Sequence, residues 1–562
     1  MTYPPDNNKC KQRSRKMSKL PGKRLLAAGI VLAMSQMAIQ QVQAADVPAG
    51  VTLAAKQELI KGNGGEVQSL DPHKIEGSPE SNVSYDLLEG LAVVGTEGKV
   101  IPGVAESWEN KDGKVWTFHL RKNALWSNGA PVTAQDFVYS WRRLVNPKTA
   151  SPYASYLQYG HVENVDDIIA GKKSPDQLGV KALDDHTLQV TLTTSVPFFD
   201  QLLTYAALSP VYPPVVEKYG DQWTLPQHWV GNGAYTLQSH IVNEKIVVVR
   251  NPKYWDNAHT VINKVTFLPI DSEVNDVNRF YSANGSDVTY NNLPIELFRK
   301  LKQDHPKDLH VDPYLCTYFY ELNNKSAPFN DVRVRTAIKL GLDRDIVVNK
   351  VLAQGQTAAY SLTDPATNGI DVTKPAWFTE TQAQRNAEAK KLLQEAGYGP
   401  GHPLTFTLLY NTSDLHKKLA IAAASLWKKN LGVNVVLENQ EWKTYLDSRH
   451  QGTYQMARAG WCADYNEPSA FLNTMQTGDS NNTAFYSDTA FDQVLKDAAN
   501  ASDAAQRASD YQKAEQILDK DSAIVPVFYY ANTRLVKTYV GGYTGKDPLD
   551  HVYDKNLYII KH

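Results

Sequence analysis

The sequence is poor in cysteine and in the motifs that mark metal sites. Its 562 residues contain three cysteines, and no two of them are spaced as a Cys-x-x-Cys pair. The 14 histidines are scattered and form no His-Glu-x-x-His motif. Because zinc sites depend on such closely spaced ligands, a metal centre is disfavoured. The sequence also lacks the Gly-x-Ser-x-Gly turn of serine hydrolases, so it predicts neither a cofactor nor an enzyme.

Long hydrophobic runs are absent as well. An apolar stretch at Leu25–Met34 has about ten residues, whereas a membrane span needs about 20. Basic residues precede this stretch, and the small residues Val42-Gln-Ala44 follow it. That order is typical of an export signal, so residues 1–44 are predicted to form a signal peptide that is cleaved after Ala44. An amphipathic membrane anchor is the alternative.

An excess of basic charge is the third absence. The chain has 58 Lys and Arg against 60 Asp and Glu. Subtracting the eight basic residues and one acidic residue of the predicted signal leaves 50 basic and 59 acidic residues, a net charge of about −9. Nucleic acids and anionic membranes both require a basic face, so neither is expected as a partner.

The few cysteines nevertheless allow one specific prediction. Cys10 lies within the predicted signal, which leaves Cys316 and Cys462. A single pair in an exported chain favours one disulfide. The bridge would enclose about 146 residues, and in the loop-entropy description it would stabilise the fold by about 4–5 kcal/mol.

Hydrophobic periodicity predicts a mixed α/β fold, and the length suggests roughly three domains. Alternation at Val115–Leu120 predicts a half-buried strand. Thr133 and Asp136 resemble a capping box for a helix that runs through Leu144. A further helix is predicted over residues 379–396, where Ala, Glu, Lys and Gln are abundant.

A βαβ unit is predicted in the second half of the chain. A strand at Leu404–Tyr410 precedes the capping segment 411–414, a helix that Gly432 ends, and a second strand at Val433–Leu437. His416 falls in the first helical turn, at the carboxyl end of the strand, where α/β folds commonly bind ligands. A solvated residue at a helix start is the alternative.

The segment Arg458-Ala-Gly-Trp-Cys-Ala-Asp-Tyr-Asn-Glu-Pro468 concentrates the candidate chemistry. Asp464 lies among residues that favour burial, and the nearest basic residue is Arg458, six positions earlier. A buried acid requires a cation or several hydrogen-bond donors. Asp464 could therefore await a cation that arrives with a ligand, or it could be a structural acid that bonds backbone N–H groups or a distant lysine.

Three ordered motifs resemble signatures of the bacterial extracellular solute-binding proteins of the peptide/nickel class, family 5. They are Phe118–Ser140, Gly231-Asn-Gly-Ala-Tyr235 and Asn251-Pro-Lys-Tyr-Trp255. The segments at 410–418, 458–468 and 541–550 look like the oligopeptide-binding branch of this family. The resemblance covers residues 45–562. It implies the α/β fold of a type II periplasmic binding protein, with two hinged lobes and an extra inserted domain.

The resemblance also implies domain boundaries. The first lobe would comprise residues 45–88, 213–315 and 532–562, and the inserted domain residues 89–212. The second lobe would be residues 316–531. Both cysteines of the predicted disulfide then belong to the second lobe, so the bridge would leave lobe closure free.

In this family a short peptide binds between the lobes. Carried over, Asp464 would pair with the peptide's N-terminal ammonium. Arg458, His416 and Arg449 would serve its carboxylate at several ligand lengths, for which the planar fork of arginine is well suited. A surface ion pair is the alternative for Arg449, and a place in the core is the alternative for the aromatic residues. The other positions that the resemblance assigns to the site are Glu76, Tyr153, Tyr290, Tyr314, Trp442, Gly460, Trp461, Cys462 and Tyr530.

The resemblance implies a monomeric periplasmic protein of a Gram-negative bacterium. It would capture peptides of about two to five residues and deliver them to an inner-membrane ABC permease with its ATPase subunits. Leu352 replaces a lysine that the oligopeptide-binding branch uses near the ligand carboxylate, and Gly231 replaces a threonine. Both features resemble the murein-peptide-binding branch, which lacks the cysteine pair.

Three alternatives remain open at this point. The ligand could be restricted to murein peptides or to dipeptides. It could be a metal chelate or haem, although such a binder is expected to omit the acid at 464. A peptidase would require a Ser–His–Asp triad assembled from distant positions.

Overall fold

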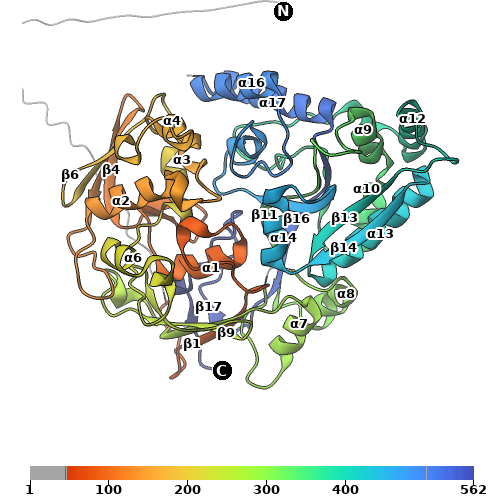
Figure 1. Cartoon of the computed structure of the whole chain (residues 1–562). Helices are drawn as coiled ribbons and strands as arrows, with labels where there is room; N and C mark the ends of the chain where they lie inside the picture. Colours follow the sequence, from red (N-terminus) through yellow and green to blue (C-terminus); the bar gives the residue numbers. More distant parts are fainter. Residues whose placement is uncertain (1–44, 46, 291, 502) are drawn as a thin grey trace, which may run out of the picture. The chain divides into compact units, whose positions relative to one another are not determined.

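Two long antiparallel strands, β11 (Leu309–Leu322) and β16 (Ile524–Leu535), lie side by side in a six-stranded mixed sheet (Figure 1). The computed structural model describes residues 45, 47–290, 292–501 and 503–562, so the predicted signal peptide at 1–44 lies outside the described residues. The strand order of the sheet is β12-β16-β11-β15-β13-β14. Its other strands are β12 (Thr357–Ala358), β15 (Met456–Cys462), β13 (Thr405–Asn411) and β14 (Asn434–Gln440).

The predicted βαβ unit forms one edge of this sheet and is confirmed. Strands β13 and β14 pair in parallel, and α13 (Asp414–Leu431) connects them. The Ser413 hydroxyl caps the helix by accepting a hydrogen bond from the His416 backbone N–H. Gly432 ends the helix with a positive φ of 74°, a conformation that glycine adopts without steric cost.

A second sheet has the order β1-β10-β9-β8, in which β1 and β10 are parallel. A third, antiparallel sheet has the order β4-β5-β7-β6. Their strands are β1 (Glu58–Gly62), β10 (Lys264–Leu268), β9 (Lys245–Arg250), β8 (Tyr235–Ile241), β4 (Ala105–Lys111), β5 (Val115–Leu120), β7 (Thr187–Thr191) and β6 (Val180–Asp184). The predicted strand at 115–120 is confirmed as β5.

Two further strand pairs are short: β2 (Ala92–Val94) with β3 (Val100–Pro102), and β17 (Val540–Gly541) with β18 (Tyr558–Ile559). The longer helices, besides α13, are α1 (Ser78–Leu87), α2 (Ala134–Val145), α6 (Pro213–Tyr219), α7 (Glu273–Tyr281), α8 (Ile295–Asp304), α9 (Val332–Gly341), α12 (Gln382–Glu395), α14 (Trp442–Gln451), α16 (Thr489–Asn500) and α17 (Ala504–Asp521). The short ones are α3 (Tyr156–Tyr159), α4 (Val165–Ile169), α5 (Phe199–Leu202), α10 (Arg344–Ile346), α11 (Ala376–Thr379) and α15 (Ser469–Leu472).

The helix predicted after Thr133 is confirmed as α2, where the backbone N–H of Thr133 donates to Asp136 Oδ2 at 2.8 Å. The helix predicted over 379–396 begins three residues later, as α12. A separate turn, α11, ends at Thr379, and the Thr381 side chain then caps α12. The predicted start fell on the last residue of α11, and the break at Glu380–Thr381 separates that turn from α12.

The domain boundaries stay a prediction. Strand β11 runs through the predicted boundary at 315/316, and β16 runs through the one at 531/532. Leu352 is 1% exposed and packs in the apolar core beside the six-stranded sheet. A Cβ atom on Gly231 would lie 2.4 Å from the Leu87 carbonyl oxygen, so close packing requires glycine there. Within the described ranges, no helix is both long enough and apolar enough to cross a bilayer.

Candidate functional site

A cavity of about 490 Å³ is lined by segments that are far apart in the sequence. Its volume lies in the range of small-ligand sites. All thirteen binding residues named from the resemblance line it: Glu76, Tyr153, Tyr290, Tyr314, His416, Trp442, Arg449, Arg458, Gly460, Trp461, Cys462, Asp464 and Tyr530. The structure therefore brings the set together, while the role of each residue stays a prediction.

Strand β15 supplies one wall of the cavity. Because side chains alternate along a strand, Arg458, Gly460 and Cys462 share one face. Cys462 lies directly opposite Cys316 of β11, and the two form the predicted disulfide, which is confirmed. A Cβ atom on Gly460 would lie 3.1 Å from Arg458 Nη2 and 3.3 Å from the Tyr530 hydroxyl. Glycine at this position leaves the space beside the guanidinium open.

Asp464 lines the cavity two residues beyond the end of β15. It is 6% exposed, and its Oδ2 has no hydrogen-bond partner among the described residues. Burial raises the pKa of Asp464 well above its ordinary value, and the Tyr153 hydroxyl only partly opposes this rise. The part of the chain that is described thus supplies neither the lysine nor the backbone donor that a structural acid would need at Oδ2.

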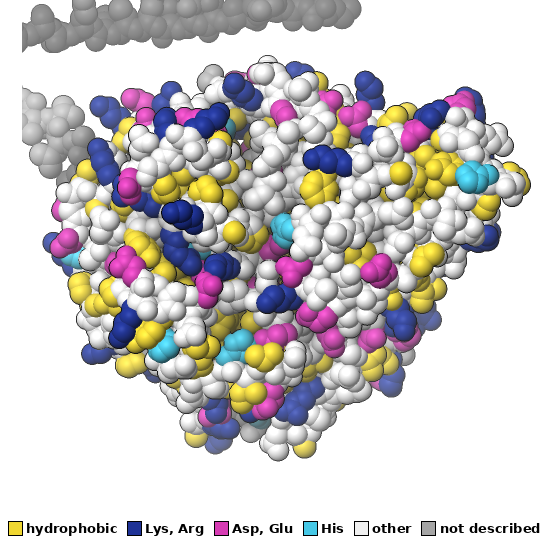
Figure 2. Space-filling model, in the orientation of Figure 1, with side chains coloured by type: hydrophobic (Ala, Val, Ile, Leu, Met, Phe, Trp, Pro, Cys, Tyr) yellow, Lys and Arg dark blue, Asp and Glu magenta, His cyan; other side chains and the backbone are white. Residues whose placement is uncertain are grey.

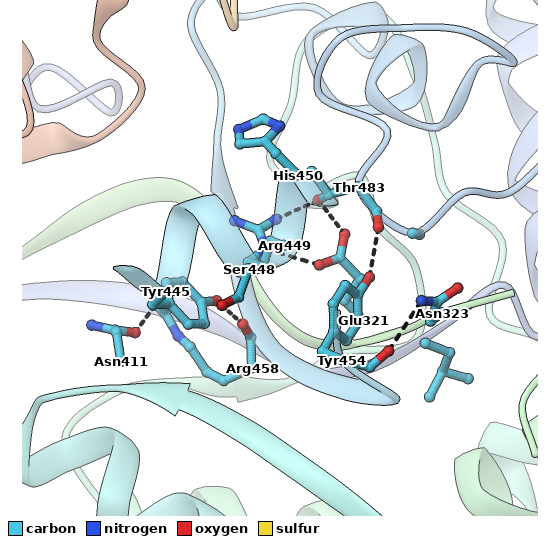
Figure 3. A network of polar contacts seen from close by, with 12 residues as sticks. Glu321, Asn323, Asn411, Tyr445, Ser448, Arg449, His450, Tyr454, Arg458 and Thr483 are labelled. Atoms are coloured by element: carbon cyan, nitrogen blue, oxygen red, sulfur yellow. Dashed lines mark hydrogen bonds and ion pairs between the residues drawn. The ribbon is translucent and has the colours of Figure 1, made fainter. Parts of the chain in front are cut away.

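Arg458 is a cation held by neutral groups. Its Nη2 donates to the Tyr530 hydroxyl at 2.9 Å. Its Nη1 donates to Asn411 Oδ1 at 3.3 Å (Figure 3). The guanidinium carbon lies 5.2 Å from the centre of the Tyr318 ring. Its Nε has no hydrogen-bond partner among the described residues. The side chains that its Nη atoms contact carry an amide and a hydroxyl, not a carboxylate. The arginine therefore retains the capacity to bind an anion.

His416 lies in the first turn of α13, as predicted, but it is 7% exposed, so the solvated alternative is wrong. Its Nδ1 has no hydrogen-bond partner within the described residues. Burial and the nearby Arg458 lower its pKa well below the ordinary value. The imidazole is therefore neutral at neutral pH and would meet a carboxylate as an N–H donor rather than as a ready cation.

Arg449, in contrast, already has acidic partners. Figure 3 shows its guanidinium in contact with both Glu321 and Thr483: Nε donates to Glu321 Oε2 at 2.9 Å, and Nη2 donates to Thr483 Oγ1 at 2.8 Å. Its Nη1 lies 3.7 Å from Glu76 Oε1. Burial alone would lower the pKa of Arg449, but the acids raise it well above its ordinary value. The surface ion pair considered for Arg449 is in fact a buried one.

Glu76 links this group to a histidine. His450 Nε2 lies 2.7 Å from Glu76 Oε2. Burial would raise the pKa of Glu76, but its contacts with His450 and Arg449 lower it below the ordinary value. Glu76 in turn raises the pKa of His450 against the effect of burial. The side chains of Glu76, Glu321 and Arg449 are buried and that of His450 is 30% exposed, so two acids and two bases form one cluster.

The aromatic residues both pack and face the cavity. Trp461 Nε1 donates to the Ala470 carbonyl at 2.7 Å, and its ring lies nearly parallel to that of Tyr153, with centroids 6.3 Å apart. Trp442 begins α14, and its Nε1 donates to Glu80 Oε1 at 3.3 Å. These rings therefore combine a core contact with a place in the cavity wall.

Helix α7 contributes wall residues that sequence reasoning missed. Glu273 Oε1 accepts hydrogen bonds from the Ser413 hydroxyl at 2.7 Å and from the Leu415 backbone N–H at 3.4 Å. In the reverse direction, the Ser272 hydroxyl donates to Asp414 Oδ2 at 2.8 Å. The first turns of α7 and α13 are thereby cross-linked. The repeated Ser-acid pair at the two helix starts was a visible signal, but it indicates only ordinary capping.

Outside the cavity, charges of both signs are mixed. Figure 2 shows Lys and Arg side chains interspersed with Asp and Glu over the visible face. No group of three or more His, Cys, Asp or Glu residues suitable for a metal ion occurs in the described ranges.

The family model described as "Bacterial extracellular solute-binding proteins, family 5 Middle" matches residues 99–483. The chain is 66% identical over 546 residues to the periplasmic oligopeptide-binding protein OppA of Salmonella typhimurium. The aligned region covers 97% of this chain and 100% of that protein.

Solved structures give the same family and distinguish two arrangements. The Haemophilus influenzae OppA complex with the peptide RPPGFSPFR is similar with a TM-score of 0.89 and 54% identity, covering 91% of this chain and 100% of that one. The unliganded open form of the murein tripeptide-binding protein MppA gives a TM-score of 0.64 at 46% identity, covering 92% of this chain and 99% of that one. The described residues thus resemble the peptide complex more than the open form.

Proposed function

The chain belongs to the bacterial extracellular solute-binding proteins of family 5, and from that premise we propose that it captures short oligopeptides in its cavity. It is a binding protein rather than an enzyme, as its relatives are. The finer proposal is that Asp464 binds the peptide's ammonium and that Arg458 binds its carboxylate.

One observation carries this proposal. The cavity wall holds a buried acid and a cation that both lack a charged partner among the described residues. A peptide is the common ligand that carries an ammonium at one end and a carboxylate at the other. Burying either of its ends without a partner would cost several kcal/mol. The same argument applies to Asp464 and Arg458, so each charge on the ligand satisfies one on the protein.

The spacing suits a short ligand. In an extended strand each residue advances about 3.3 Å, so the Cα atoms of Arg458 and Cys462 are about 13 Å apart. Asp464 lies slightly farther along the chain. An extended peptide advances by a similar amount per residue, so this span corresponds to about four residues, which lies within the proposed range of about two to five. Main-chain hydrogen bonds to β15 would fix the backbone, and water could accommodate varied side chains.

Delivery and location follow from the family and belong to the proposal. We expect a monomeric periplasmic protein that transfers its peptide to an inner-membrane ABC permease and its ATPase subunits. The greater similarity to a peptide complex than to an open form supports a closed arrangement around the ligand. The permease would then distinguish closed from open protein.

The murein-peptide alternative was based on Leu352 and Gly231. Neither residue lines the cavity. Leu352 is a core residue, and Gly231 is required by its neighbour Leu87. These two departures therefore do not by themselves narrow the ligand range. The general oligopeptide function is the one that the cavity supports.

Native mass spectrometry of the protein as purified tests the proposal. A mixture of peptides of about two to five residues is the expected cargo. After unfolding, dialysis and refolding, tri-alanine should bind with 1:1 stoichiometry by calorimetry, and N-acetylated, C-amidated tri-alanine should not. A single murein peptide as cargo, with no binding of tri-alanine, would overturn the general function.

A further inference from the structure

Helix α7 places two acids on the cavity wall that the end-group chemistry above does not use. Glu273 and Asp276 are three residues apart, so they share one helix face. Asp276 is 2% exposed, its Oδ2 accepts from the Tyr290 backbone N–H at 2.7 Å, and its Oδ1 has no partner in the described chain. The Oε2 of Glu273 is likewise buried without a partner.

The charges that face this pair are mostly negative. Asp414 of α13 raises the pKa of Glu273, as burial does. Burial raises the pKa of Asp276 to about 7, with a further contribution from Glu273. Arg534 of β16 opposes that rise, but its guanidinium is bound to Asp550. Neither Glu273 nor Asp276 forms an ion pair with a base in the described ranges, so a cation from outside would complete both oxygens.

The location of the pair indicates which part of a peptide it would meet. Glu273 contacts the first turn of α13, the turn that also holds His416. The next residues toward β13 lead back to Asn411, which accepts from Arg458. These are the groups assigned to the peptide's carboxyl end, whereas Asp464 lies beyond the opposite end of β15. A peptide cation that reaches α7 would therefore belong to a side chain of the peptide rather than to its N-terminal ammonium.

We propose that Glu273 and Asp276 form a subsite for the ammonium or guanidinium of a basic side chain near the carboxyl end of the bound peptide. This inference rests on the proposed peptide-binding function and makes it more specific. The protein then prefers Lys or Arg at that position, and an anionic side chain is disfavoured there. The competing explanation is that Asp276 merely anchors the Tyr290 backbone.

A matched set of tripeptides tests the subsite. Calorimetry at pH 7 compares Ala-Ala-Lys with Ala-Ala-norleucine, which has a similar side chain without the charge. A charge-assisted hydrogen bond predicts that the lysine peptide binds about 10- to 100-fold more tightly. In Asp276→Asn this ratio should fall to about twofold or less, because the neutral amide attracts the ammonium weakly. Asp271→Asn, which changes an exposed acid of the same cavity, should leave the ratio unchanged.

Proton release gives a second readout. Asp276 is partly protonated in the empty cavity, so binding of Ala-Ala-Lys should release more protons than binding of Ala-Ala-norleucine. Calorimetry in buffers of different ionisation enthalpy measures the number of protons released. If Asp276→Asn does not fold, Glu273→Gln replaces it and should lower the lysine preference in the same way.

The possible outcomes distinguish a failure of the proposed subsite from a failure of the proposed peptide-binding function. Equal affinity for the two peptides in the unmodified protein, or a preference that survives both substitutions, overturns the subsite while peptide binding remains. A lysine preference confined to Lys-Ala-Ala also overturns it. Failure of all tripeptides, tri-alanine included, would instead refute the proposed function.

Discussion

Asp464→Asn is the most direct test of the end-group chemistry. The substitution keeps the shape of the side chain and removes its charge. The carboxylate is 6% exposed and has no partner at Oδ2 among the described residues, so a bound ammonium would be its main counter-charge. Removing one member of a buried charge pair costs about 3–5 kcal/mol, which corresponds to a loss of affinity for tri-alanine of about 150- to 5,000-fold.

Isothermal calorimetry with two ligands isolates this pair. N-acetylation of tri-alanine removes the ammonium from the ligand, as the substitution removes the carboxylate from the protein. If the two groups bind each other, the acetylated peptide should bind weakly to the unmodified protein and lose little more in Asp464→Asn. Asp364→Asn is the control, because Asp364 is also 6% exposed, and burial raises its pKa to about 6, but it does not line the cavity.

Stability of the unliganded protein should change in the opposite direction. The folded-state pKa of Asp464 is raised, so its ionisation destabilises the fold as pH rises above about 4, the value in the unfolded chain. Asp464→Asn removes this penalty, and the free energy of unfolding at pH 7 should be unchanged or higher. An unaltered affinity for tri-alanine, or a stability loss of several kcal/mol, would refute the reasoning.

Three further predictions concern other parts of the molecule. Arg458→Gln should weaken tri-alanine binding by about 2–5 kcal/mol. C-amidated tri-alanine, which lacks the carboxylate, should bind the variant as weakly as it binds the unmodified protein. Equal losses of affinity for both peptides would contradict the carboxylate role. Replacing Cys316 and Cys462 together by serine removes a bridge across 146 residues and should lower the unfolding free energy by about 4–5 kcal/mol in urea titrations, whereas an unchanged midpoint and slope would exclude that contribution. Asp479, which accepts from the Tyr159 hydroxyl, has a pKa raised by burial to about 7. The protonated form of Asp479 therefore favours the folded state. Its stabilisation is complete below about pH 4 and is lost as the pH rises toward 7, which lowers the free energy of unfolding by up to about 4 kcal/mol. Thermal unfolding of Asp479→Asn should show a flatter pH profile, and an identical profile would contradict the assignment.

The local parts of the fold were predictable because their signals are short-range. Alternation gave β5, and the Thr133 capping pattern gave the start of α2. The βαβ unit followed from the capping segment before α13 and from Gly432 after it. The cysteine pair required no spatial information, since one pairing was possible after the predicted cleavage. Each of these features depends on residues that are adjacent in sequence or on simple counting.

The partners of the charged residues were not predictable in the same way. Glu321 meets Arg449 from 128 residues away, and Glu273 meets Ser413 from 140 residues away. Such contacts depend on sheet register and helix placement, which local patterns do not determine. The spacing around Asp464 excluded nearby bases but could not exclude distant ones. The structure was needed to show that no described base reaches it.

Charge balance favours Arg458 over Arg449 as the proposed anchor for a peptide carboxylate. Glu321 and Glu76 already surround Arg449, so a third carboxylate there would meet two like charges and would have to displace at least one of them. Arg458 is held by a hydroxyl and an amide, and a carboxylate that reaches it adds the opposite charge that its surroundings lack. The acid at Asp464 is in the converse situation. A ligand that bridges Arg458 and Asp464 would relieve two unbalanced charges at once. Its two ends are therefore expected to supply most of the affinity, while side chains away from the proposed acidic subsite on α7 would be free to vary.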